Sequence, residues 1–480
     1  MASGSLYSKL DWKLIIYYLV LVIFGWLNIY SSVHAENSVL FDFSERSGMH
    51  FIWMCISIAI AAAIIFLIPS KIYQVFSWWL YIFMIALLLL VLAVGIDIKG
   101  SRSWISLGSF TFQPAEFSKI TTSIALAALM GKYGFQFSRF NCWVKACATI
   151  GLPMLLILLE KETGSMLVYL GFLLVFYLDG MSGWILLGGL FAILEFILCL
   201  VFSPFVALLV LTCCFLLLYF INARKIVPGI LITAAAAVLL SFLPKLLLTD
   251  ALITKNLFPA EIWLAIIGTG TCLTIFVRNL IVRYKDSFLR NLLICYILFT
   301  GFIFSVQFIF ENVLQDHQRA RIEVLLGMKD DPKGVGYNVH QSLIAIGSGG
   351  LFGKGYMQGT QTRFDFVPEQ TTDFIFCTIG EEWGFVGCLA VLILYFLLLM
   401  RIFNKAGQSG DAFTRIYGYC VASCLLMHIL INVGMTIGLM PVIGIPLPFL
   451  SYGGSSLLAF TILLFIFIRL DLDQWRYLKQ

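Results

Sequence analysis

The chain has 480 residues, of which 61% are hydrophobic and 12% are charged. Soluble domains carry a charge on about a quarter of their residues, so this composition excludes a soluble protein and predicts an integral membrane protein with many spans. The net charge of +5 comes from short basic clusters between apolar runs. Such clusters are orientation signals rather than a nucleic-acid-binding surface, and no DNA or RNA partner is expected.

The apolar runs set the expected architecture, because a membrane-spanning helix needs about 20 apolar residues. We predict an all-α polytopic membrane protein that forms one integral domain over residues 1–480. Fourteen runs of spanning length occur, at 14–32, 50–69, 76–97, 117–131, 145–159, 164–179, 183–203, 205–222, 227–248, 259–278, 289–310, 374–401, 416–437 and 454–470.

The basic residues predict the orientation of these spans, because loops that stay in the cytoplasm are enriched in Lys and Arg. With a cytoplasmic N-terminus, the pairs Arg224–Lys225 and Arg401–Lys405 both fall on the cytoplasmic side. This arrangement predicts that both termini are cytoplasmic. It also places a large loop, residues 311–373, on the outer face.

The first outer segment with unusual polarity precedes the fourth span and contains Arg102 and Gln113. If a helix begins at Pro114, a favoured first position, Glu116 and Lys119 share one face. A plainer interpretation is a carboxylate that meets the helix dipole and a lysine that snorkels to the interface. A second polar cluster, Glu160 to Glu162, lies between two further apolar runs.

The large outer loop supplies Arg319 and Arg321 and then becomes rich in glycine. The run from 330 to 355 is too apolar for disorder and too glycine-rich for a regular helix, so a re-entrant segment is expected. Its GGLFGKG stretch, which contains Lys354, lacks the spacing of a phosphate loop.

Asp373 follows, where the chain turns apolar again. A carboxylate at the mouth of an apolar helix is costly and marks a functional candidate, although T-T-D before an apolar run is also a good helix N-cap. The last outer loop has irregular, proline-rich sequence, which is tolerated at membrane depth only where it lines a cavity or is buried in protein. Its expected cavity-lining residues are Pro446, Pro448, Ser451, Tyr452 and Gly453.

Several stretches together resemble the SEDS family (shape, elongation, division and sporulation), and most closely its RodA branch. They are FQPAEFSK (112–119), DPKGVGYNVHQSLIAIGSGGLFGKGYMQGTQ (331–361), FVPEQTTDFIF (366–376), GEEWGFVG (380–387) and NVGMTIGLMPVIGIPLPFLSYGGSS (432–456). The resemblance implies a peptidoglycan glycosyltransferase that polymerises lipid II on the outer, periplasmic face of the bacterial cytoplasmic membrane and supports cell elongation and shape. It also implies a class B penicillin-binding protein as the transpeptidase partner.

The resemblance assigns roles to individual residues. The essential aspartate of the family falls on Asp373, its Q-P-x-E-F-x-K motif on 113–119, and the arginine of its Q-x-x-R segment on Arg321. The sequence departs from the family pattern in two places. Thr371 replaces a histidine, and EKETGS (160–165) replaces the motif Q-P-D-L-G-T, so that the acid of this motif survives only as the longer Glu162. Because family members have about ten helices, residues 183–285 are predicted to be a four-helix insertion.

The implied reaction needs a base for the acceptor hydroxyl and cations for the pyrophosphate leaving group. We expect Asp373 to be the base, with inversion at the donor carbon. The residues expected to bind substrate or pyrophosphate are Lys119, Glu116, Arg102, Arg321, Gln113, Lys354 and Glu162, with Lys119 and Arg321 foremost. A divalent cation, Mg²⁺ or Mn²⁺, suits pyrophosphate and carboxylates, whereas no organic cofactor is expected.

One competing function is a flippase that transports the lipid-linked precursor. A transporter predicts polar residues near the bilayer midplane and repeated architecture. Here the unexplained polar residues gather on the expected outer face, which favours the enzyme.

Overall fold

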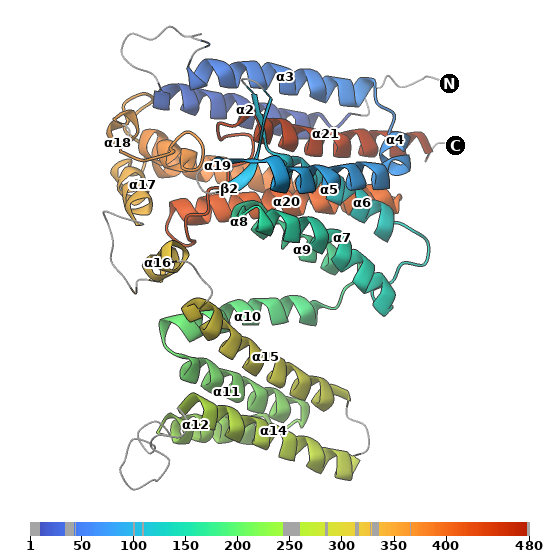
Figure 1. Cartoon of the computed structure of the whole chain (residues 1–480), viewed down its shortest axis with the longest axis vertical. Helices are drawn as coiled ribbons and strands as arrows, with labels where there is room; N and C mark the ends of the chain where they lie inside the picture. Colours follow the sequence, from blue (N-terminus) through green and yellow to red (C-terminus); the bar gives the residue numbers. More distant parts are fainter. Residues whose placement is uncertain are drawn as a thin grey trace. The chain divides into compact units, whose positions relative to one another are not determined.

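The computed structural model describes residues 10–33, 43, 45–98, 101–107, 110–242, 260–283, 287–312, 316–326, 328, 336–364 and 366–477. The chain forms two compact units. The first combines Met1–Ser182 with Asp330–Gln480, and the second is Gly183–Lys329. Figure 1 shows the elements of both.

The first unit is a helical bundle with a small sheet. Its helices are α2 (Trp12–Val33), α3 (Arg46–Phe66), α4 (Lys71–Val75), α5 (Ser77–Val94), α6 (Pro114–Met130), α7 (Phe140–Leu159), α8 (Thr163–Tyr169), α9 (Phe172–Leu178), α17 (Tyr337–Ser348), α18 (Thr360–Arg363), α19 (Ile375–Gly407), α20 (Ala412–Thr436) and α21 (Gly454–Tyr477).

Three antiparallel strands make the all-α prediction incomplete. They are β1 (Ile96–Ile98), β2 (Ser101–Leu107) and β3 (Phe110–Phe112), in the order β1-β2-β3. The register pairs Ile96 with Trp104 and Ile105 with Phe112. The strands contain aromatic and β-branched residues such as Trp104, Ile105 and Phe112, which favour β structure.

Helices α20 and α21 form the centre of the first unit, because 72% and 89% of the residues in their apolar 18-residue stretches are buried. Helix α6 packs against α20 and is buried along almost its whole length, while α3 packs against α21 and α19 against α20. Figure 1 shows these helices side by side. The polar residues of α6 and α20 therefore lie inside the protein.

Helix α19 is interrupted at Gly384, whose backbone dihedrals (φ 65°, ψ −162°) are not helical. The interruption leaves a half-helix, residues 375–383, directly after Asp373. The sequence GEEWGFVG lies inside a continuous apolar run, so hydropathy alone does not reveal this break.

The second unit consists of α10 (Gly183–Val201), α11 (Pro204–Asn222), α12 (Ile226–Ser241), α14 (Ala260–Arg283), α15 (Ser287–Asn312) and α16 (Asp316–Leu325). Helix α11 contacts α10, α12, α14 and α15. Thr212 and Tyr296 share a hydrogen bond of 3.0 Å between their hydroxyl oxygens, inside an apolar cluster that includes Leu211 and Phe215.

Each of the fourteen predicted apolar runs overlaps a helix among the described residues. Within the described part of the chain, ten helices are long and apolar enough to cross a membrane, and the protein is a multi-pass membrane protein. The other four runs lie on α6, on α8 with α9, on α12 and on α14. The count of fourteen spans and the positions of the termini stay predictions.

The glycine-rich part of the outer loop is more regular than predicted. Residues 337–348 form helix α17, so the expectation that this run is too glycine-rich for a regular helix is wrong. Gly347 is the one glycine within these twelve residues, and the other glycines of the run flank the helix in the sequence, at 334 and 336 before it and at 349, 350, 353 and 355 after it. Buried Ser342 and Ala345 give α17 a small-residue face, and the helix packs on α19.

Candidate functional site

The start of α6 holds a buried ion pair. The predicted helix start at Pro114 is confirmed, with Gln113 at the N-cap position and its carbonyl accepting from the Glu116 amide at 3.2 Å. Because Glu116 and Lys119 then lie three residues apart on one face, Lys119 Nζ reaches Glu116 Oε1 at 2.9 Å. The two side chains are 2% and 3% exposed, which rules out the snorkelling interpretation for Lys119.

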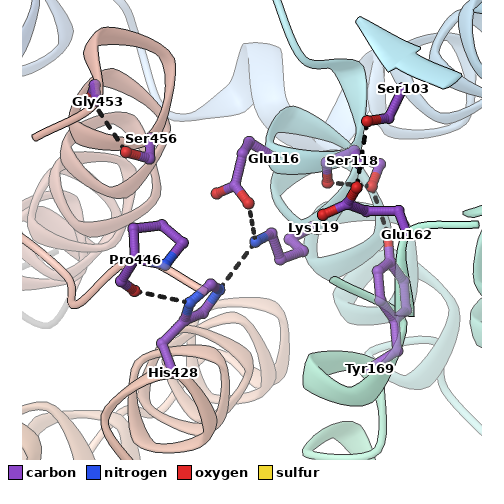
Figure 2. Close-up of polar contacts among 11 residues, drawn as sticks. Ser103, Glu116, Ser118, Lys119, Glu162, Tyr169, His428, Pro446, Gly453 and Ser456 are labelled. Carbon is purple, nitrogen blue, oxygen red and sulfur yellow. Dashed lines mark hydrogen bonds and ion pairs between the residues drawn. The ribbon is translucent and has the colours of Figure 1, made fainter. Parts of the chain in front are cut away.

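His428 of α20 is the second partner of Lys119. Its Nε2 lies 2.8 Å from Lys119 Nζ, and its Nδ1 lies 3.3 Å from the carbonyl oxygen of Pro446. A carbonyl can only accept, so Nδ1 carries the proton and donates to Pro446, while Nε2 accepts from the lysine ammonium. Figure 2 shows this chain of contacts from Glu116 through Lys119 and His428 to Pro446.

Asn432 connects the predicted base to the same loop. It lies one helical turn after His428 on α20, and its Nδ2 donates to the carbonyl oxygens of Asp373 at 2.8 Å and Ile445 at 2.6 Å. Adjacent loop residues, Ile445 and Pro446, are thus held by two side chains of one helix face. Neither His428 nor Asn432 was among the predicted site residues.

Asp373 itself is half-buried and precedes α19 in a turn closed by its amide, which donates to the Glu369 carbonyl at 3.0 Å. The N-cap of α19 is Phe374, so the N-cap interpretation of Asp373 is not supported. The Asp373 carboxylate lies beside Gly444: a Cβ there would be 3.2 Å from Oδ2. Gly444 also has φ +76°, so a side chain at this position is doubly disfavoured.

Thr371, the residue that departs from the family pattern, has an unpredicted neighbour. Arg46, at the start of α3, donates from Nη1 to Thr371 Oγ1 at 3.1 Å and is otherwise exposed. The Thr371 carbonyl accepts from the Tyr452 amide at 2.8 Å. The exposed guanidinium of Arg46 therefore contacts Thr371, which lies two residues before Asp373 in the chain.

Two carboxylates of the turn 160–162 complete the surroundings of α6. Glu162 Oε2 accepts from Ser103 of β2 at 3.2 Å (Figure 2), and burial raises the pKa of Glu162, as does nearby Glu116. Glu160 is fully buried, and neither of its carboxylate oxygens has a hydrogen-bond partner in the described part of the protein. Burial, with Glu162 close by, raises the pKa of Glu160 to about 8.

The other predicted cations are placed differently. Arg102 is exposed on β2, and its backbone amide donates to the Glu160 carbonyl at 3.1 Å. Lys354 forms an ion pair with Glu381 at 2.7 Å. To bind pyrophosphate, Lys354 would have to interact with Glu381 and the pyrophosphate at the same time. Arg321 belongs to α16 of the second unit, and its side chain lies outside the described residues.

Hydrogen bonds hold several of the predicted cavity-lining residues in place. The Pro448 carbonyl accepts from the Tyr395 hydroxyl, and Ser451 Oγ accepts from the Leu447 amide at 2.8 Å. The Gly453 carbonyl accepts from Ser456 Oγ at 3.0 Å (Figure 2). These bonds satisfy an irregular backbone inside the protein, as the sequence requires; their role as a cavity wall stays a prediction.

The sequence held one usable signal for the residues it missed. His428 and Asn432 are spaced four apart within an otherwise apolar span, and polar residues at that spacing share a face. Interior polar residues of membrane helices are functional candidates by default.

Comparisons with known proteins place the chain. A family model described as "Cell cycle protein", covering FtsW, RodA and SpoVE, matches residues 11–215 and 257–475. The peptidoglycan glycosyltransferase RodA of Treponema pallidum is 30% identical over 452 residues, which cover 94% of each chain. The peptidoglycan glycosyltransferase MrdB of Escherichia coli is 28% identical over 450 residues, which cover 94% of this chain and 90% of MrdB.

Solved structures share the fold. A peptidoglycan synthase complex, described as coordinating polymerization and crosslinking, contains a chain that matches with a TM-score of 0.62 at 22% identity, covering 97% of this chain and 99% of the other. RodA of Thermus thermophilus matches with a TM-score of 0.54 at 22% identity, covering 97% and 98%. The chain therefore belongs to the FtsW, RodA and SpoVE family, as a RodA-like member of the SEDS proteins.

Proposed function

We propose that this protein is a peptidoglycan glycosyltransferase that polymerises lipid II on the outer face of the bacterial cytoplasmic membrane and so supports cell elongation and shape. Its similarity to RodA and MrdB supports the reaction class. One structural observation carries the assignment of residues: His428 and Asn432 hold adjacent carbonyls of one loop, and thereby join Lys119 to Asp373.

In the proposed reaction, an acceptor sugar hydroxyl attacks the anomeric carbon of the donor. Asp373 takes the hydroxyl proton, the new glycosidic C–O bond forms, and the bond to the lipid pyrophosphate breaks with its electron pair leaving on the phosphate oxygen. Attack opposite the leaving group inverts the anomeric carbon. Asp373 suits the role of base because it is only half-buried, while Gly444 leaves room beside its carboxylate.

The cations have separate proposed tasks. Lys119 uses two of its three N–H donors on Glu116 and His428, so it supplies a fixed positive charge that stabilises the developing pyrophosphate. Arg102 and Arg46 are exposed and can reach substrate with bidentate geometry.

A divalent ion fits the donor set poorly as a protein-only site. Among the described residues, no group of three or more His, Cys, Asp or Glu side chains comes together to hold a metal. Glu116 Oε2 is buried and has no hydrogen-bond partner among the residues that the structure describes, so Glu116 offers one carboxylate oxygen near Lys119. We propose that Mg²⁺ or Mn²⁺, where it is required, enters with the substrate pyrophosphate.

The proposed partner is a class B penicillin-binding protein that cross-links the glycan strands. The matching peptidoglycan synthase complex, with its coupled polymerization and crosslinking, supports this pairing.

The test is polymerisation of fluorescent lipid II by the purified protein, with and without the transpeptidase, resolved as glycan strands on a gel. A parallel assay measures lipid II translocation across liposomes. Strand formation supports the glycosyltransferase. Translocation without strand formation would instead favour the flippase and contradict the proposal.

A further inference from the structure

The half-helix that follows Asp373 is cut off from the rest of its span. In a continuous helix the amides of Phe385 and Val386 would donate to the carbonyls of Glu381 and Glu382. The break at Gly384 prevents both bonds. Four backbone groups are then left without helical partners, in a protein whose spans offer no water to satisfy them.

The glycine-rich segment 350–355 supplies all four missing partners. The amides of Phe385 and Val386 donate to the carbonyls of residues 350 and 351, at 2.9 and 3.1 Å. The freed carbonyls of Glu381 and Glu382 accept from the amides of residues 354 and 355, at 3.0 Å each. The segment therefore forms backbone hydrogen bonds with both sides of the break in α19.

Glycines permit this close approach. A Cβ on Gly353 would collide with the Glu382 carbonyl, and a Cβ on Gly384 would collide with the backbone nitrogen of Gly353. Gly349 likewise abuts the carbonyl of Gly380. The stretch that superficially resembles a phosphate loop thus packs against backbone.

The Glu381 side chain fixes the next part of the loop. Its Oε1 accepts from Lys354 Nζ and the Thr360 amide, both at 2.7 Å, and from the Gln361 amide at 2.8 Å. Its Oε2 accepts from the Thr362 amide at 2.9 Å. Glu381 is fully buried, so one carboxylate gathers an ammonium and three consecutive amides onto the half-helix.

We infer that Glu381 is a positioning residue for the proposed glycosyl transfer, and the inference rests on the proposed function of Asp373. The half-helix has Asp373 at one end, where Asn432 holds its carbonyl. At the other end, the Glu381 side chain and the four backbone hydrogen bonds with residues 350–355 connect it to the outer loop. When Glu381 loses these hydrogen bonds, the half-helix shifts and displaces Asp373. Glu381 acts in this way without contacting the substrate itself.

The experiment compares wild type with Glu381→Gln. This substitution keeps the side-chain shape but replaces Oε2 with an NH₂ group, which cannot accept the hydrogen bond of the Thr362 amide. Hydrogen exchange at residues 354–362 reports on the loop, and lipid II polymerisation gives kcat and KM. Asp471→Asn is the matched control, since it removes an ion pair at the opposite end of α19, where Lys405 Nζ lies 3.2 Å from Asp471.

We expect Glu381→Gln to speed exchange at 360–362 by roughly tenfold or more. Its kcat should fall by about 10- to 100-fold because the base is misplaced, while KM changes by less than about threefold because no substrate contact is lost. The control should leave exchange at these residues and kcat as in wild type. Unchanged exchange, or faster exchange with unchanged kcat, overturns the inference.

A second variant guards against a misfolded Glu381→Gln. Lys354→Met removes one donor and leaves the three amides on Glu381, so it should raise exchange modestly, lower kcat and keep KM. A raised KM with unchanged exchange would mean that Lys354 binds substrate, which contradicts the positioning role. An inactive wild type would sink the proposed function alone, because the exchange measurement still tests the loop contact.

Discussion

Replacing Lys119 with methionine separates its structural role from its chemical one. The Lys119 side chain is 2% exposed, and its Nζ lies 2.9 Å from Glu116 Oε1 and 2.8 Å from His428 Nε2. Lys119→Met keeps most of the side-chain volume but leaves Glu116 as an unpaired buried carboxylate and His428 Nε2 without a donor.

The expected cost follows from these contacts. Removing one partner of a buried ion pair destabilises a protein by about 3–5 kcal/mol, and a buried acceptor that loses its donor costs roughly 1–3 kcal/mol. We therefore expect a loss of about 3–4 kcal/mol in the free energy of unfolding. Glu116→Gln added to Lys119→Met removes the buried charge and should recover about half or more of that loss.

Unfolding in detergent and lipid II polymerisation, measured on the wild type, both single variants and the double variant, check this cycle. Stability should return in the double variant while activity stays lost, because no cation remains to stabilise the pyrophosphate. A single variant within about 1 kcal/mol of wild type would refute the account of the ion pair. A double variant that polymerises normally would remove Lys119 from the reaction.

Three further outcomes are expected. Because the folded protein holds the proton of Glu160 up to about pH 8, whereas the unfolded chain releases it near 4.5, stability should fall as pH rises between these values, and Glu160→Gln should flatten that dependence in thermal unfolding. Gly444→Ala should abolish polymerisation because its methyl group would crowd Asp373 at 3.2 Å; Gly134→Ala, at φ +85° with no atom within 4 Å, controls for backbone strain alone and should stay active. A single cysteine at position 290, in a background without other exposed cysteines, should be labelled only from the cytoplasm, and labelling from outside would overturn the four-helix insertion.

Much of the bundle could be read from hydropathy, because apolar runs of spanning length have few alternatives to helix. The start of α6 was also predictable, since Pro114 suits a first helical position and fixes the spacing of Glu116 and Lys119. The predicted site residues Gln113, Glu116 and Lys119 therefore meet in the structure for a local reason.

Long-range features were not predictable from one sequence. His428 belongs to a span that reads as apolar, and its contact with Lys119 joins residues 309 positions apart. The break at Gly384 could not be predicted, because the backbone groups that it leaves unpaired bond to residues 350–355, which lie earlier in the chain. Lys354 looked like an available cation because its partner, Glu381, follows 27 residues later.

Asp373→Asn tests the central claim most directly. The substitution keeps the backbone bond to Asn432 and the space beside Gly444, while removing the proposed base. Polymerisation of lipid II by the purified variant should fall at least about 100-fold, the contribution of a general base, with unchanged unfolding temperature. The exposed carboxylate Glu311, changed to glutamine, is the matched control and should polymerise normally. Wild-type polymerisation by Asp373→Asn would contradict the account.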